Sequence, residues 1–368
     1  MRCPFTCCLL FATTVALPSQ TTHLVGPGGF ATFAAALAAA APGDVLLVQP
    51  GSYAEAIDAD IGVTIRALGT VQVQHMTPPS WNVPPGQNLH VDGVTFTGSV
   101  DVRSGRVTLS HCTILPAFGG TNPALSAKDC SVHLVGCALT SLFGSTAFGQ
   151  VGTQAENTHL TAVDTSFTAA GAFFAPVAVR LIGSQFVASG CSFPVDAFSG
   201  GLGIFATAGS AVWLSDSTIE AGPSQCPIVA IGSTVRYERC TLSPTTATNC
   251  ATSAPGPTLL GVHAPSPLQS GATYSLQFQG APFQFVALHA SPGVATTALP
   301  ALFEQPLQLD LATAWFVGLY ATDATGAAGA SWNLPAGQFV DTPLWLQAIT
   351  VEPTFPWQVA PVVGGIVR

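Results

Sequence analysis

Residues 107–114 read VTLSHCTI, and segments of the same form recur six more times between residues 89 and 242. Each octet has apolar residues at positions one, three and eight, and a small or compact residue at position six. The octets begin 18 to 28 residues apart, about 24 on average, and read LHVDGVTF (89–96), VTLSHCTI (107–114), VHLVGCAL (132–139), LTAVDTSF (160–167), FVASGCSF (186–193), VWLSDSTI (212–219) and VRYERCTL (235–242). This alternation, followed by a compact residue, predicts a short strand that turns sharply into another strand.

A repeat of this length predicts a solenoid, because one coil cannot bury its apolar side chains whereas stacked coils can. With coils about 4.8 Å apart, the sixth octet positions would form an interior column. Free cysteine is a compact apolar side chain that is often buried, so packing is favoured for these cysteines over a catalytic role. The column comprises Val94, Cys112, Cys137, Thr165, Cys191, Ser217 and Cys240.

The composition narrows the possible partners. Charged residues make up 7% of the 368 residues, against about 25% in a typical soluble domain, and the net charge is −9 with a single lysine, Lys128. Phosphate binding needs clustered Lys and Arg, so the composition argues against nucleic acid as a partner. The 48% of hydrophobic residues can supply a large core despite 37 Gly and 29 Pro.

The first 19 residues are typical of a secretory signal. Arg2 precedes an apolar run from Phe5 to Leu17, which is too short to span a bilayer. A buried N-terminal strand is the alternative. No other segment has 18 consecutive apolar residues, so we expect a secreted or cell-surface protein without a membrane span.

The segment after the signal carries a family resemblance. A helix expected at about 30–41 is followed by Pro42-Gly43-Asp44, a strand at 44–49, Pro50-Gly51-Ser52-Tyr53 and a strand at 63–67. This order resembles the N-terminal cap of right-handed parallel β-helix proteins of the pectin-lyase-like superfamily, and with the octets the resemblance covers about 22–252. The resemblance implies that the helix covers the open end of the stack, where strand edges would otherwise be unpaired.

That superfamily contains polysaccharide lyases, polygalacturonases, adhesins and surface proteins without known activity, and a fold alone does not select among them. The sequence has no paired-Asp calcium motif, no Arg-x-Pro-x-x-Arg, no Asn-Thr-Asp and no Gly-His-Gly. A non-catalytic structural or glycan-recognising role is therefore favoured. The alternative is a polysaccharide lyase or glycoside hydrolase with carboxylates on different coils.

Alternation along a strand turns the second, fourth and fifth octet positions away from the interior. Stacking of the last coils would make neighbours of Trp213, Asp216, Arg236, Glu238 and Arg239. An exposed Trp213 can stack on a sugar ring, while Arg236 and Asp216 bind hydroxyls or a uronate. The alternative is a surface ion pair between Arg236 and Glu238, with Trp213 covered by a loop.

Three further features remain open. His133 is a low-ranking ligand candidate, because the nearby His111 occupies a different octet position. Arg180 alternates with apolar residues and can line a groove on a neighbouring sheet. Cys226 and Cys250 lie 24 residues apart, about one coil, and can stack and form a disulfide, although sequence cannot fix the connectivity.

Beyond a Pro/Thr/Ser-rich stretch at 243–258 the octet disappears. Alternating strands are expected at 274–278, 283–289, 307–311, 315–320 and 344–351, with Leu307, Leu309 and Leu311 on a buried face. These strands predict a small antiparallel β-sandwich, which weakly resembles C-terminal β-domains of exported bacterial proteins. Trp315 and Trp345 are expected in its core, and Trp332 and Trp357 at its surface.

The sequence thus predicts an all-β chain with a signal peptide at 1–19, a right-handed parallel β-helix with a cap helix at 20–252 and a β-sandwich at 257–368. We expect no metal ion or cofactor, because no CxxC, CxxH or calcium-loop spacing occurs. A polysaccharide or cell-surface glycan is the expected partner.

Overall fold

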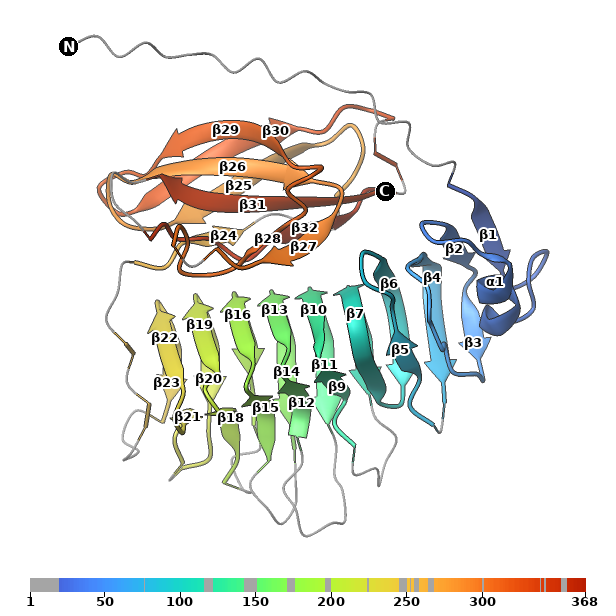
Figure 1. Ribbon diagram of the computed structural model, residues 1–368, viewed down its shortest axis with the longest axis horizontal. Helices are drawn as coiled ribbons and strands as arrows, with labels where there is room; N and C mark the ends of the chain where they lie inside the picture. Colours follow the sequence, from blue (N-terminus) through green and yellow to red (C-terminus); the bar gives the residue numbers. More distant parts are fainter. Residues whose placement is uncertain are drawn as a thin grey trace.

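The structure is a computed structural model that describes residues 20–368, apart from 76, 116–121, 142–150, 171–175, 196–199, 224, 245–249, 252, 255–257, 264–267, 300, 338, 341 and 352–355. The predicted signal peptide at 1–19 lies outside the described residues. The chain forms a parallel β-helix followed by a small antiparallel β-module, as predicted (Figure 1).

Three parallel ladders build the β-helix. The first ladder contains β1 (Thr22–Val25), β2 (Val45–Val48), the start of β4 (Thr64–Gln74), the start of β6 (Asn88–Thr97), the end of β7 (Val100–Ser110), β10 (Cys130–Val135), β13 (His159–Val163), β16 (Gln185–Ser189), β19 (Ala211–Ser215) and β22 (Thr234–Glu238).

The second ladder follows the first around the corner. It contains β3 (Gly51–Tyr53), the ends of β4 and β6, β8 (Thr113–Leu115), β11 (Ala138–Ser141), β14 (Ser166–Ala169), β17 (Ser192–Phe193), β20 (Thr218–Glu220) and β23 (Thr241–Ser243). The third ladder closes each coil with β5 (Ser80–Asn82), the start of β7, β9 (Leu125–Lys128), β12 (Val151–Glu156), β15 (Val177–Ile182), β18 (Leu202–Thr207) and β21 (Ile228–Ala230).

The octets stack in the register that their sequences predict. First positions pair with one another from Leu89 through Val235, and each exposes 3% or less of its surface. The sixth-position column lies in the interior as expected, with only Cys240 partly exposed. The thiol of Cys137 lies 3.3 Å from the Leu109 carbonyl oxygen, and Ser217 Oγ donates to the Ser215 carbonyl at 2.7 Å. Packing and hydrogen bonding therefore account for these side chains.

The corner between the first two ladders explains the fifth octet position. All seven residues there have φ between 48° and 75°, in the left-handed region. Glycine enters this region at no steric cost, and Asp and His enter it more readily than most other residues. They are Gly93, His111, Gly136, Asp164, Gly190, Asp216 and Arg239. A second left-handed column, at the corner from the third ladder to the first, includes Asp129, Asn157 and Gly183.

The cap helix α1 (Phe33–Ala39) is shorter than the expected 30–41 because Thr32 begins it. Thr32 Oγ1 accepts from the Ala35 amide, and the Glu55 carboxylate accepts from the Phe33 amide at 2.8 Å. Phe33 and Ala36 are fully buried and close the first coil. The Pro-Gly-Asp turn is fixed by Asp44, which accepts hydrogen bonds from the amides of Thr21 and Ala41.

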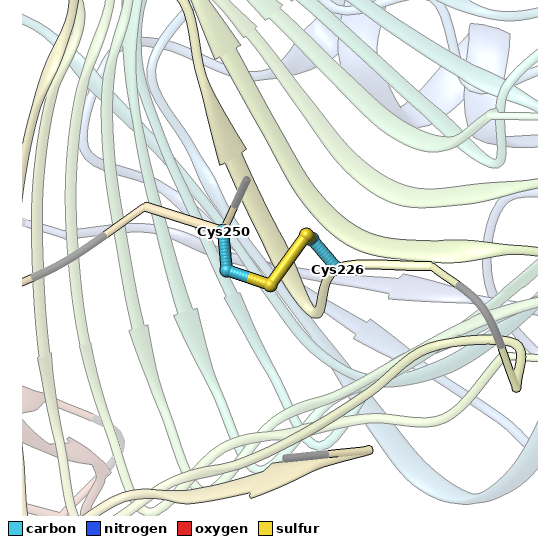
Figure 2. The surroundings of a disulfide bond; sticks show 2 residues. All are labelled: Cys226 and Cys250. Carbon is cyan, nitrogen blue, oxygen red and sulfur yellow. A yellow bond between two sulfur atoms is a disulfide. The ribbon is translucent and has the colours of Figure 1, made fainter. Parts of the chain in front are cut away.

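The other end of the solenoid extends past the expected linker start. The amide of Ala251 donates to the Ile228 carbonyl and that of Ala254 to the Val235 carbonyl, so these residues add to the last coil. Cys226 and Cys250 form the disulfide that tethers this segment, with Cα atoms 5.1 Å apart (Figure 2).

The C-terminal module contains two antiparallel sheets and a two-stranded ribbon. One sheet has β24 (Gly261–His263), β25 (Thr273–Gln279) and β30 (Ala327–Asn333), and the other has β29 (Trp315–Ala321), β26 (Phe285–Ser291), β31 (Pro343–Val351) and β32 (Val363–Ile366). The ribbon pairs β27 (Val294–Thr297) with β28 (Leu307–Leu309). Leu276, Val286 and Leu346 are fully buried in the core that the two sheets share.

Two expectations for this module are wrong. Leu311, expected on the buried face with Leu307 and Leu309, is 53% exposed. Gln308, which lies between those two leucines, is buried because it faces the solenoid. Trp315, expected in the core, is 37% exposed and stacks on Phe339. Trp345 is fully buried, but at the contact with the solenoid instead of in the core between the two sheets.

Candidate functional site

The C-terminal module lies along the first ladder of the solenoid (Figure 1). The second octet positions turn away from the interior of the solenoid, but the C-terminal module covers them. Of the two alternatives that the sequence left open, the covered Trp213 with an Arg236–Glu238 ion pair is therefore closer to the structure than an exposed sugar-binding face. Trp213, between Val187 and Arg236 in this column, is half-buried. The other six expose 6% or less of their surface, namely His90, Thr108, His133, Thr161, Val187 and Arg236.

The centre of this junction is apolar and aromatic. The indole of Trp345 packs against the imidazoles of His90 and His133, with ring centroids 5.5 and 5.2 Å away. Val135 shares a buried cluster with Trp345. Gln308 Nε2 donates to Thr161 Oγ1 at 2.8 Å. His133 is therefore part of the junction and packs on Trp345, whereas His111 binds Asp92.

The predicted cluster around Trp213 exists, with an added member. The carboxylate of Glu304, from the module, binds the Arg236 guanidinium and accepts from Trp213 Nε1 at 3.3 Å. Glu238 lies 3.7 Å from Arg236 on the other side. These contacts occupy the groups that the sequence assigned to a sugar.

Asp216 is linked to this cluster through Arg239, which also lies 3.6 Å from Glu238. The two carboxylate oxygens of Asp216 accept from the Nε and NH2 groups of Arg239 at 2.7 and 3.0 Å, and Arg239 also donates to the Leu259 carbonyl oxygen. Of the predicted ligand residues, Trp213, Asp216, Arg236 and Glu238 are thus gathered at one end of the junction. The fifth, His133, lies at its centre. Sequence reasoning could not find Glu304, which lies 68 residues beyond Arg236 and outside any repeat.

A second ionic network lies at the opposite end. Asp92 accepts from His111 Nδ1 at 2.9 Å, from Ser110 Oγ at 2.9 Å and from Arg368 at 2.8 Å. Burial opposes the charge of Asp92, but the hydrogen bonds from His111 and Arg368 hold the pKa of its carboxyl well below its usual range. His90 Nε2 lies 2.8 Å from Ser110 Oγ. The Ser–His–Asp grouping is buried beneath the module and fastens it.

The outer face of the third ladder carries a different set of side chains. Arg180 is exposed, and it makes no ion pair or side-chain hydrogen bond with any residue that the structure describes. Gln154 and Phe205 are its half-buried register neighbours on β12 and β18. The full register-aligned row runs Ser80, Asp101, Ser126, Gln154, Arg180, Phe205 and Val229.

Exposed ion pairs flank this row. Arg103 Nε donates to Asp101 at 2.7 Å, and Lys128 Nζ donates to Glu156 at 2.8 Å. A groove of about 300 Å³ opens beside Asp101 and Arg103. Its other polar lining residues are Thr77, Ser99, Asn122 and Ser126. Such a surface offers donors, acceptors and one aromatic ring to an extended polar ligand.

Neither Asp101 in this row nor the nearby Glu156 has an acidic neighbour in register. Asp101 is flanked by Ser80 and Ser126, and Glu156 by Lys128 and Ile182. Glycoside hydrolysis uses two carboxyl groups about 5–10 Å apart. Among the described residues, no group of three or more His, Cys, Asp or Glu side chains is arranged to hold a metal ion. No helix in the described ranges is long and apolar enough to cross a membrane.

Comparison with known proteins gives weak structural likenesses. No protein-family model and no curated protein matches the chain. One similar solved structure is the tailspike protein gp49 of Acinetobacter baumannii bacteriophage Fri1, a capsular polysaccharide depolymerase, at 9% identity and a TM-score of 0.20, covering 88% of this chain and 77% of that one. Another is a double mutant of the tailspike of E. coli bacteriophage HK620, at 9% identity and a TM-score of 0.12, covering 91% and 85%. The parallel β-helix assignment rests on the strand pairing of this chain itself.

Proposed function

We propose that this protein is an extracytoplasmic glycan-recognising β-helix protein without catalytic activity, and that its ligand lies along the outer face of the third ladder. The observation that carries the proposal is the row Gln154, Arg180 and Phe205, aligned across three neighbouring strands, in which Arg180 is exposed and the other two side chains are half-buried. An Arg guanidinium binds carboxylates or hydroxyls through several donors, and a phenyl ring offers an apolar face to a sugar ring.

The rest of the face suits an extended polymer. Neighbouring rungs are about 4.8 Å apart, so a chain running along the solenoid axis meets a new set of polar groups at each rung. The Asp101–Arg103 and Lys128–Glu156 pairs are exposed. Such pairs contribute only about 0–1 kcal/mol, so a ligand can replace them at little cost.

One sequence prediction and one structural feature support an extracytoplasmic location. The predicted signal at 1–19 is one, and the Cys226–Cys250 disulfide is the other, because disulfides persist mainly in oxidising compartments. The alternative, a lyase or hydrolase, is less well supported. The acidic side chains Glu238 and Glu304 that do converge are both engaged by Arg236.

The test is affinity electrophoresis in gels containing polygalacturonate, alginate, hyaluronan or galactomannan. Wild-type protein is expected to be retarded by at least one polymer. Arg180→Ala and Phe205→Ala should each weaken binding about tenfold, which corresponds to about 1.4 kcal/mol. Phe316→Ala, which removes an exposed aromatic ring from the C-terminal module, is the matched control and should bind like wild type.

Three results would contradict the proposal. If none of the polymers retards the protein, glycan recognition is contradicted and a structural role is left. Loss of binding in Trp213→Ala but not in Arg180→Ala would move the ligand to the first-ladder junction. New reducing ends or unsaturated products in the polymer would make the protein an enzyme.

A further inference from the structure

A groove of about 520 Å³ lies where the corner between the third and first ladders meets the C-terminal module. Its volume is within the range of about 300–1,000 Å³ that is common for small-molecule sites, which often form between domains. It is separate from the groove beside Asp101 and Arg103. Its polar lining residues are Arg106, Asp129, Ser131, Asn157, His159 and Thr296.

The solenoid side is built by the left-handed corner. Asp129 and Asn157 have φ of 51° and 50° in successive coils, and both are exposed. Asn157 Nδ2 donates to Asp129 Oδ1 at 3.1 Å. The pair therefore forms a fixed carboxylate–amide edge that keeps further acceptors and a donor for a ligand.

The opposite wall belongs to the C-terminal module and is anchored to the solenoid by two contacts. Ser131 Oγ lies 2.8 Å from Thr296 Oγ1, and the NH1 group of Arg106 donates to the Val294 carbonyl oxygen at 3.1 Å. Both contacts join residues more than 160 positions apart in the chain. The solenoid supplies most of the lining, and the docked module closes one side of the groove with Thr296.

The charges of the lining residues cancel. Arg106 carries one positive charge and Asp129 one negative charge. Burial lowers the pKa of His159 below 6.5, so this imidazole is neutral near pH 7. The remaining groups are hydroxyls and an amide, which both donate and accept. A neutral set of this kind matches the hydroxyl groups of a sugar and does not favour an anion or a cation.

We infer that this groove binds a neutral saccharide of one or two residues, held at once by the Asp129–Asn157 edge of the solenoid and the Thr296 wall of the C-terminal module. The site does not depend on the polymer surface of the third ladder. Because its walls belong to both modules, the bound sugar stabilises their docking by mass action.

The experiment is thermal unfolding and isothermal titration with D-glucose, D-galactose, D-mannose, maltose and lactose at millimolar concentrations. At least one sugar should raise the Tm of wild-type protein by a few degrees. Asp129→Asn and Asn157→Gly should abolish that shift. Both replacements tolerate positive φ, and unchanged far-UV circular dichroism will show that the variants fold.

Glu156→Gln is the matched control, because Glu156 precedes Asn157 but faces Lys128 outside the groove, and it should keep the full shift. Hydrogen exchange with the bound sugar should slow at both 129–131 and 294–297. The inference is overturned if no sugar shifts the Tm, if Asp129→Asn responds like wild type, or if D-galacturonate binds more tightly than D-galactose. Polymer retardation that depends on Arg180 would survive any of these outcomes.

Discussion

Trp345 of the C-terminal module and His133 of the solenoid lie edge to face, with ring centroids 5.2 Å apart. The outward-facing second octet positions are therefore buried between the solenoid and the C-terminal module. His90 lies against the same indole, so two neutral imidazoles and one indole form the middle of the junction. Both ends are ionic, with Glu304 binding Arg236 and Arg368 binding Asp92. The two modules are therefore expected to unfold together.

Stability should fall on mild acidification. Burial lowers the pKa of His90 to about 4 and that of His133 to about 3, from 6.5 in the unfolded chain. Below pH 6.5 the two imidazoles bind protons in the unfolded chain but stay neutral in the folded protein. The free energy of unfolding therefore decreases as pH falls from about 6.5 to 4. The slope is up to about 1.4 kcal/mol per pH unit for each histidine.

Denaturant unfolding at pH 7, 6 and 5 will measure this slope. The double variant His90→Gln/His133→Gln should have a flatter pH dependence over the same range, whatever its stability at pH 7. Asp44 and Asp92 do not confound the test. Their lowered pKa values affect stability only as pH falls below their ordinary value of 3.8. Equal slopes for the variant and wild type would show that His90 and His133 do not cause the pH dependence of stability.

Glu304 is expected to matter more for stability than an exposed acid. Its removal in Glu304→Ala leaves Arg236, whose side chain is 5% exposed, without its closest carboxylate. Because Glu238 remains 3.7 Å from Arg236, the loss should lie below the cost of a wholly unpaired buried charge, at about 1.5–3 kcal/mol. Asp101→Ala breaks the exposed pair with Arg103 and should cost under about 1 kcal/mol. Urea denaturation of both variants will measure the two losses of stability. Equal losses would contradict our account.

The disulfide should stabilise the end of the solenoid. Cys226 and Cys250 close a loop of 24 residues, for which the chain-entropy estimate is about 3–4 kcal/mol. The variant Cys226→Ser/Cys250→Ser should lose stability of this order. It should also show faster hydrogen exchange at Ala251 and Ala254, whose amides bind the last coil. Unchanged exchange there would show that the tether does not hold the segment.

The interior cysteine column should tolerate polarity better than size. Cys137 is 4% exposed, Thr165 occupies the same position in the next octet, and Ser217 occupies it in a later one. Cys137→Ser can keep a hydrogen bond to a carbonyl and should cost about 1 kcal/mol or less. Cys137→Leu overpacks the corner and should cost about 1–3 kcal/mol. Thermal unfolding will measure the stability of the two variants. If Cys137→Leu is the more stable, the corner is not too tight for a large side chain.

The fold was predictable because the information is local and repeated. Apolar residues at octet positions one and three set the strand register, and compact residues such as Cys112 mark the corner. Among the described strands of the two C-terminal sheets, β24, β30 and β32 were not expected from the sequence. In β30, AAGASWN, the alternation of Ala328, Ala330 and Trp332 is a weak signal because alanine is a poor strand former. Periodicity predicts the stacking of coils because each coil repeats the same burial pattern.

The covering of the octet face was not predictable in this way. Arg236 and Glu304 are 68 residues apart and Asp92 and Arg368 are 276 apart, and no repeat relates their positions. An outward octet position looks the same in sequence whether it meets water or another module. Arg180 was recognisable as a groove residue by its alternation with apolar neighbours, whereas its alignment with Phe205 depends on the register across loops of variable length.

Hydrogen exchange of the full-length protein, with and without a polymer that retards it, tests most directly where the glycan lies. Our account predicts added protection in the outer strands of the third ladder, at 101–103, 126–128, 154–156, 180–182 and 205–207, with none at Trp213 or Arg236. Protection confined to β19, β22 and the segment around Glu304 would contradict it and return the ligand to the junction between the modules.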